Sequence, residues 1–285
     1  MNKFLLREQL TRFFQEDIGF GDRTSQSIFS DETSEAIYIA KEAGVFAGET
    51  VLKEGYALLQ EDIELKLMKK DGEKVEVGDV IATVTGPTVE LLSTERVLLN
   101  LVQRMSGIAT LTNKAQDQLK GSKTNVCDTR KTTPGLRMLE KHAVVCGGGA
   151  NHRLRLDDAI MIKDNHIAQS GSITEAVRRV KEKIGHMVKI EVETESIEEV
   201  IEAVAAGADV IMLDNCSVEE ATERVKDIPD HIITEVSGGI TLETIADYKH
   251  SGVDYISLGA LTHSVKALDI SLNIKVNGGT KYDSK

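Results

Sequence analysis

From residue 124 onward the chain repeats one local pattern, a short apolar strand-like segment followed by polar or glycine-rich residues and then an amphipathic helical segment. Strands that alternate with helices pair in parallel, because each helix returns the chain to the start of the next strand through a right-handed crossover. This many repeats predict a closed or nearly closed α/β barrel, and an open doubly wound sheet is the alternative. The expected strands are residues 124–128, 159–162, 188–192, 209–213, 232–236 and 255–258.

The first third of the chain has other periodicities. Helical spacing of apolar side chains predicts a helix over residues 3–16, and a period of two predicts strands at 36–40, 64–68 and 80–84. Residues 71–86 resemble the hairpins of lipoyl and biotinyl carriers, although the tight turn that bears the carrier lysine is absent. A structural α+β sandwich is therefore the favoured interpretation.

A long helical pattern over residues 89–119 connects these two parts. We expect an α/β protein with an N-terminal α+β sandwich domain at residues 1–105 and an open α/β-barrel domain at residues 106–267. The C-terminal residues 268–285 are expected to pack back on the first domain.

Charge and cysteine content exclude several classes of protein. The formal net charge of −12 disfavours nucleic acid and anionic membrane as partners, and no apolar run approaches the length of a membrane span. Cys127, Cys146 and Cys216 lie far apart and lack the spacing of a disulfide framework or a metal site. These features favour a reducing compartment, the cytoplasm.

Polar residues follow the predicted strands of the barrel, where α/β barrels carry their catalytic groups. Cations follow the first two strands, carboxylates end the next two, and glycine-rich turns follow the last two. Cations beside carboxylates predict a ligand with several negative charges bound together with Mg²⁺. These strand ends are residues 128–131, 163–166, 191–193, 214–215, 237–239 and 259–263.

The basic residues admit two interpretations. Arg130, Lys131 and Arg137 combine forked and point-like donors that suit a multiply charged acid, and the alternative is a solvated loop. The glycine-rich run before His152 and Arg153 either brings both side chains to the same ligand or is a flexible connection.

The acidic residues and the glycines are equally ambiguous. Glu191 and Glu193 share one strand face and Asp214 ends the next strand, so metal or ribose-hydroxyl binding competes with surface ion pairing. Gly238 and Gly239 let the backbone approach a phosphate, although a pair of glycines is often only a turn.

Eight short motifs nevertheless follow one another in a distinctive order. They are TERVLLN at 94–100, SGIA at 106–109, DTRKTTPGLR at 128–137, GGGANHR at 147–153, IKDNHI at 162–167, LDN at 213–215, SGGI at 237–240 and LGALTH at 258–263. Together they resemble the quinolinate phosphoribosyltransferases, the carboxylating nicotinate-nucleotide pyrophosphorylases of NAD synthesis, over nearly the whole chain.

The resemblance implies a reaction and an assembly. Quinolinate and phosphoribosyl pyrophosphate would give nicotinate mononucleotide, CO₂ and pyrophosphate, with Mg²⁺ as the cofactor. A homodimer, or an assembly of dimers, would share its active sites, because the N-terminal domain of one subunit would cap the barrel of the other. Arg96 would then enter the partner's site.

The same matching implies residue roles. Lys131, Lys163, Glu193 and Asp214 would be catalytic, with the two carboxylates also binding ribose hydroxyls and Mg²⁺. The dicarboxylate would be held by Arg96, Arg130, His152 and Arg153, with Thr129 beside them. The 5-phosphate would bind at Ser237, Gly238, Gly239, Gly259, Ala260 and Leu261.

Some features depart from the family pattern. Arg155 and Val236 stand where the family commonly has glycine and alanine, and the acidic loop of commoner phosphoribosyltransferases is absent. The donor of the proton after decarboxylation stays open among Lys131, Lys163 and water. Alternatives to the main hypothesis are a relative with another acceptor, a Schiff-base aldolase using Lys163, and a metabolite-sensing or carrier module.

Overall fold

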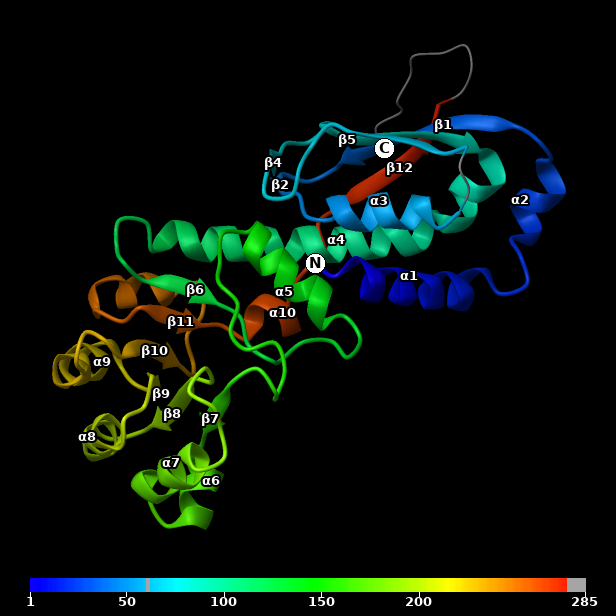
Figure 1. Cartoon of the computed structure of the whole chain (residues 1–285). Helices are drawn as coiled ribbons and strands as arrows, with labels where there is room; N and C mark the ends of the chain where they lie inside the picture. Colours follow the sequence, from blue (N-terminus) through cyan, green and yellow to red (C-terminus); the bar gives the residue numbers. More distant parts are fainter. Residues whose placement is uncertain (60–61, 276–285) are drawn as a thin grey trace. The chain divides into compact units, whose positions relative to one another are not determined.

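The computed structural model describes residues 1–59 and 62–275 of the 285-residue chain, which form two compact units (Figure 1). Of the described residues, those of Met1–Thr110 and those from Lys266 onward belong to the first unit, and Leu111–Val265 forms the second. The end of the expected C-terminal tail, residues 276–285, lies outside the described residues. Across the described part of the chain, every helix is too short or too polar to cross a membrane.

The first unit is built on an antiparallel sheet with the strand order β12-β1-β5-β3. Residues 36–40 of the central strand β1 are all buried, so elements cover this strand on both faces. The hydroxyls of Tyr38 and Tyr56 lie 2.7 Å apart and join the strand to helix α3. The strands are β1 (Thr33–Ala40), β3 (Glu64–Leu67), β5 (Val80–Pro87) and β12 (Ile270–Ile274).

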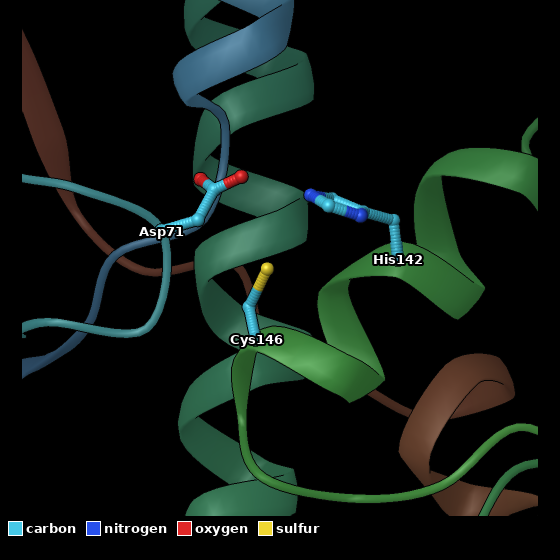
Figure 2. A group of neighbouring side chains, drawn as sticks. All are labelled: Asp71, His142 and Cys146. Atoms are coloured by element: carbon cyan, nitrogen blue, oxygen red, sulfur yellow. The ribbon is translucent and has the colours of Figure 1, made fainter. Parts of the chain in front are cut away.

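The helices of this unit begin with α1 (Lys3–Ile18), which Asn2 caps by accepting hydrogen bonds from two backbone N–H groups. Helix α2 (Arg23–Ile28) is capped by Asp22, which accepts hydrogen bonds from the backbone N–H and the hydroxyl of Ser25. Helix α3 (Glu49–Ala57) begins after Gly48, which has no side chain. Asp71, whose side chain is drawn in Figure 2, supplies the missing acceptor, at 2.7 Å from the backbone nitrogen of Gly48 and 2.9 Å from that of Glu49.

The two strands within residues 71–86 do not pair with each other, unlike the carrier hairpins that this stretch resembles in sequence. Strand β4 (Lys74–Val75) pairs with β2 (Gly44–Val45), whereas β5 pairs with β1 and β3. The turn between β4 and β5 therefore carries the chain from a two-stranded sheet into the four-stranded one.

The second unit is a six-stranded parallel sheet with the order β6-β11-β10-β9-β8-β7. It confirms the α/β class, and all six strands fall within two residues of their predicted positions. No pairing joins the edge strands β6 and β7 among the described residues, so the barrel is open there. The strands are β6 (Asn125–Cys127), β7 (Ile160–Ile162), β8 (Ile190–Thr194), β9 (Val210–Asp214), β10 (Ile233–Ser237) and β11 (Tyr255–Ser257).

Helices connect these strands and lie along the outside of the sheet (Figure 1). The sequence determines where helix α8 (Ile197–Ala206) begins and ends. Ser196 caps its start, and Gly207 ends it with a φ of 78° that favours glycine. Helix α4 (Thr88–Gln118) begins in the first unit and ends in the second. The others are α5 (Arg137–Cys146), α6 (Asp164–Ser170), α7 (Ile173–Lys181), α8 (Ile197–Ala206), α9 (Val218–Arg224), η1 (Val225–Asp227), η2 (Ile245–His250) and α10 (Ala260–His263).

Alternate residues of each barrel strand face different environments. In β8 the apolar Ile190 and Val192 are buried, and Glu191 and Glu193 alternate with them on the side that lines cavities. A similar alternation holds in β10, where Glu235 lines the same cavities and Val236 is buried. The interior of this barrel is therefore unusually acidic.

Candidate active site

A cavity of about 370 Å³ lies toward the carboxyl ends of the parallel strands. Each of the six strands contributes a residue of its own or one just beyond its end, as expected for a sheet that curves around a common centre. Cations, carboxylates, hydroxyls and two methionines share this surface. The lining residues are Thr129, Arg130, Lys131, His152, Arg153, Met161, Lys163, Glu193, Met212, Asp214, Glu235, Ser237 and Ser257.

Arg130 and Lys131 follow β6 and are exposed. The backbone of Lys131 is fixed on both sides, because its N–H donates to Thr129 Oγ1 at 3.0 Å and its carbonyl accepts from Thr262 Oγ1 at 2.7 Å. Among the described residues, no carboxylate pairs with either cation. Their charge is therefore available to an anionic ligand.

Arg137, by contrast, holds the loop together. Its Nε donates to Thr132 Oγ1 at 2.9 Å and its Nη1 donates to the carbonyl of Leu154 at 3.3 Å. It is absent from the lining of the cavity. Arg137 therefore stabilises the loop beside the cavity and does not contribute to the surface of the cavity.

A buried ion pair lies behind this loop. Asp128 and Lys141 have side chains only 0% and 3% exposed, and the ammonium of Lys141 donates to Asp128 and, at 2.9 Å, to the carbonyl of His152. Asp128 also accepts from Asn151 Nδ2 at 2.5 Å and from the backbone N–H of His152 at 3.0 Å. Burial raises the pKa of Asp128 although Lys141 opposes that shift. The network fixes the glycine-rich segment that carries His152.

His152 uses both ring nitrogens within the protein. Nε2 lies 2.9 Å from Glu191 Oε2 and 3.8 Å from Glu235 Oε1. Nδ1 accepts a hydrogen bond from the backbone N–H of Arg153 at 2.8 Å, so the ring proton sits on Nε2. Burial lowers the pKa of His152, but the hydrogen bond and charge of Glu191 outweigh burial and raise it above the ordinary value.

Glu235 was not predicted as a functional residue, because it lies in the middle of β10 and the predicted site residues lie at the ends of strands. Its residue is 4% exposed, and Oε1 has no hydrogen-bond partner in the described part of the chain. Burial first, and then the charge of Glu191, raise the pKa of Glu235 to about 7. A glutamate within an otherwise apolar predicted strand was the sequence signal for it.

Arg153 lies between the cations and the interior carboxylates. Nη1 donates to the carbonyl of Ala159 at 3.0 Å, and Nη2 contacts Met161 Sδ at 3.5 Å. Its buried Nε lacks a partner among the residues described. Burial, together with the positive charge of Arg130, lowers the pKa of Arg153. Two neighbouring guanidinium groups of this kind favour an anion between them.

Two carboxylates near the carboxyl ends of the strands come from the adjacent strands β8 and β9. Glu193 in β8 accepts a short hydrogen bond from Lys163, and Asp214 in β9 accepts one from Asn215 Nδ2 at 2.7 Å. The Glu193 side chain is 13% exposed and the Lys163 side chain is 43% exposed. Carboxylate oxygens at the edge of an anion-binding cavity are the donors that Mg²⁺ prefers, so these residues fit that ion.

The glycine-rich loops border the cavity. Ser237 lines it, whereas Gly238 and Gly239, with φ values of 90° and 65°, line a neighbouring cavity of about 760 Å³ beside Asn215. A Cβ atom on Gly259 would lie 2.9 Å from Lys131 Cδ, which places that loop against the cationic side. Ala260 and Leu261 follow it in α10 and are absent from the lining.

Two further basic residues are absent from the lining of the cavity. Arg96 belongs to the first unit, where its side chain on α4 is 62% exposed and lies 3.9 Å from Glu95. Arg155 is also exposed, and its Nε lies 3.4 Å from Asp157. Arg155 is thus a surface residue in an ion pair with its neighbour.

Comparison with known proteins identifies the family. The sequence family described as "Quinolinate phosphoribosyl transferase, C-terminal domain" matches residues 108–273, and the corresponding N-terminal domain matches residues 22–106. The chain is 56% identical over 277 residues to the probable nicotinate-nucleotide pyrophosphorylase [carboxylating] of Bacillus subtilis, covering 97% of this chain and 96% of that protein.

A more distant relative and two solved structures agree. The chloroplastic nicotinate-nucleotide pyrophosphorylase [carboxylating] of Arabidopsis thaliana is 43% identical over 279 residues, covering 91% of this chain and 80% of that protein. NadC from Streptococcus pyogenes superposes with a TM-score of 0.93 at 39% identity, covering 96% of this chain and 98% of that one. The Francisella tularensis nicotinate-nucleotide pyrophosphorylase gives 0.92 at 37% identity, with 96% and 98% covered. This chain belongs to the quinolinate phosphoribosyl transferase family.

Proposed function

We propose that this protein transfers the phosphoribosyl group of phosphoribosyl pyrophosphate to quinolinate, releasing pyrophosphate and CO₂ and forming nicotinate mononucleotide. One observation carries the proposal within the family: a single cavity has carboxylates at Glu193 and Asp214 and cations at Arg130 and Lys131, which pair with no carboxylate among residues 1–59 and 62–275. A dicarboxylic acceptor needs the first set and a polyhydroxylated phosphoribosyl donor needs the second.

The acceptor is assigned to the cationic side of the cavity. Arg130 and Arg153 are the two guanidinium groups beside it, and Thr129 offers a hydroxyl on the same side. His152 lines this part too, but its Nε2 is bound to Glu191, so the arginines carry most of the interaction with the carboxylates. Forked guanidinium donors suit this task because each matches two carboxylate oxygens.

The donor is assigned to the carboxylate side and the glycine-rich loops. Lys131 and Lys163 would hold the pyrophosphate, with Lys163 turning from Glu193 toward the more highly charged anion. Ser237 to Gly239 and Gly259 to Leu261 would hold the 5-phosphate. Glu193 and Asp214 would bind the ribose hydroxyls and Mg²⁺, which when bound supplies positive charge for the leaving pyrophosphate.

The chain's residues then act mainly through position and charge. Lys131 and Lys163 stabilise the negative charge that develops on pyrophosphate as the bond to C1 breaks, and C1 gains oxocarbenium character. Arg130 and Arg153 orient quinolinate so that its ring nitrogen faces C1. The new cationic nitrogen accommodates the electron pair left at C2 when CO₂ departs, so this step needs no further cofactor.

We also propose a homodimer with shared sites, in which Arg96 of one subunit contacts the quinolinate bound by the other. The support is that Arg96 is well exposed and only weakly paired, at 3.9 Å from Glu95. Inactive Arg96→Ala and Arg153→Ala proteins should regain some activity when their subunits are mixed. Proven subunit exchange without recovery would place Arg96 outside the site.

The compartment we propose is the cytoplasm, because Cys127, Cys146 and Cys216 lie far apart in the sequence and lack the spacing of a disulfide framework.

The reaction is tested by incubating the protein with quinolinate, phosphoribosyl pyrophosphate and Mg²⁺ while CO₂ and nicotinate mononucleotide are both measured. Equal amounts of the two products are expected. Turnover of nicotinate in place of quinolinate would reassign the acceptor, and a lack of product with any pyridine acid would refute the proposed function.

A further inference from the structure

A second cavity, of about 240 Å³, lies toward the amino-terminal ends of the same strands. Its lining includes the strand-start residues Ile160, Val210, Ile233 and Tyr255, and it extends to Lys189, which is exposed. It also shares side chains with the active-site cavity on the other side. The shared residues are His152, Arg153 and Glu235.

Glu235 therefore borders both cavities. On one side it lines the proposed site of the pyridine ring, and on the other it lines a space that reaches the surface of the unit. Its Oε1 is buried and has no hydrogen-bond partner among the residues that the structure describes. An unpartnered buried oxygen at such a boundary indicates a group that meets substrate or water during the reaction.

The arrangement around His152 decides which carboxyl holds a proton. The imidazole offers one N–H, because Nδ1 already accepts from the backbone of Arg153. That N–H lies 2.9 Å from Glu191 and 3.8 Å from Glu235, so Glu191 takes it. Two buried carboxylates with a single donor between them cannot both be charged without a large penalty. Glu235 is accordingly the protonated member.

We propose that Glu235 donates the proton that replaces CO₂ at C2 of the pyridine ring, an assignment that rests on the proposed function. When the bond from C2 to the carboxylate carbon breaks, CO₂ leaves and its bonding electron pair stays on C2. That pair takes the proton of the Glu235 carboxyl, which forms the C2–H bond and leaves Glu235 as a carboxylate. A proton from bulk solvent, relayed through water in the second cavity, then restores the carboxyl of Glu235.

The acid strength of this group suits the step. Burial and Glu191 raise the pKa of Glu235 to about 7, and a general acid works best when its pKa lies near the working pH. Lys131 and Lys163, the other candidate donors, are assigned to the pyrophosphate in the proposed function. The titratable or charged groups that line the two cavities together with Glu235 are Glu191, His152, Arg153, Cys127, Tyr255, Lys189, Arg130, Lys131, Lys163, Glu193 and Asp214.

The decisive variant is Glu235→Gln, which keeps the shape of the side chain and removes its acidic proton. Pyrophosphate and CO₂ are measured separately in single-turnover reactions at pH values on both sides of 7. In the wild type, CO₂ release should slow as pH rises past about 7, because the carboxyl loses its proton. In the variant, CO₂ release should fall roughly 10²-fold or more, lose this pH dependence and lag behind pyrophosphate release.

Two further variants control for structure. Glu54→Gln makes the same change at a glutamate that is also 4% exposed but pairs with Lys3 and Arg7 and lines neither cavity, so both products should appear at wild-type rates. Glu235→Asp keeps a carboxyl and should retain the pH-dependent step in CO₂ release. If Glu235→Asp and Glu235→Gln lose pyrophosphate and CO₂ release equally, the residue is structural and the proposal is wrong.

The remaining outcomes show whether only the proton assignment is wrong or the proposed function is wrong as well. An active wild type with an unchanged pH profile in Glu235→Gln would overturn the proton assignment alone. A wild type that releases neither product would overturn both proposals. His152, Glu191 and Glu235 also place three ligand atoms within 4.8 Å of one another. A stoichiometric metal that Glu235→Gln no longer binds would assign the cluster to that metal and refute proton donation.

Discussion

Lys141→Met would test how far one buried ion pair stabilises the catalytic unit. Lys141 and Asp128 are almost fully buried, and Asp128 keeps only the neutral donors of Asn151 and the His152 backbone when the ammonium is removed. Breaking one partner of a buried pair typically costs about 3–5 kcal/mol. Methionine fills a similar volume, so the loss should be electrostatic and should not reflect a cavity.

The assay is urea unfolding followed by circular dichroism at neutral pH, for Lys141→Met, Asp128→Asn and the double variant. Lys141→Met should lower the free energy of unfolding by about 3–5 kcal/mol. The double variant should lose much less than the sum of the two single losses, because it leaves no uncompensated charge. The loss in Lys141→Met should shrink in acid, where the carboxyl of Asp128 gains a proton.

Two results would refute this reasoning. A Lys141→Met protein within about 1 kcal/mol of the wild type would mean that the neutral donors alone stabilise Asp128. Strict additivity in the double variant would mean that the two side chains act independently. In either case, interactions other than the Asp128–Lys141 ion pair would hold the segment that carries His152 in place.

Other substitutions test the site. Arg130→Ala and Lys163→Ala should abolish turnover with an unchanged circular dichroism spectrum, and near-normal activity in either would contradict the assigned roles. Gly238→Ala should raise the KM for phosphoribosyl pyrophosphate, because φ is 90° and the new Cβ would lie 2.2 Å from Asn215 Oδ1; an unchanged KM would place the 5-phosphate elsewhere. Since folding raises the pKa of Glu235 from 4.5 to about 7, the free energy of unfolding should fall as pH rises between these values. Urea titrations of Glu235→Gln should lack that component.

The barrel strands were predictable because their signals are local. Each combines a short apolar run with a polar or glycine-rich end, and parallel pairing gathers those ends on one side. Arg130, Lys131, Lys163 and Asp214 line one cavity for this reason. Each of these side chains could therefore be placed without knowing the contacts of any helix.

The buried part of the site depends on contacts between residues far apart in the sequence, which local sequence patterns do not predict. Lys141 lies in a helix, and nothing in its neighbourhood in the sequence shows that it reaches Asp128 at the end of a strand. Glu235 interrupts an apolar strand, but its meaning follows from Glu191 and His152, which approach it from other segments. The resemblance of residues 71–86 to a carrier hairpin is misleading for the same reason, because β4 pairs with a strand outside that stretch.

The pairing of β12 with β1 has a consequence for synthesis on the ribosome. The register joins Ala36 to Ile274, so the first unit receives its edge strand only after Leu111–Val265 has been translated. The unit translated first is thus the last to complete its sheet. Until Ile270–Ile274 emerges, one edge of β1 stays open to pairing with other nascent chains. Truncation before Ile270 should therefore promote aggregation through the N-terminal unit.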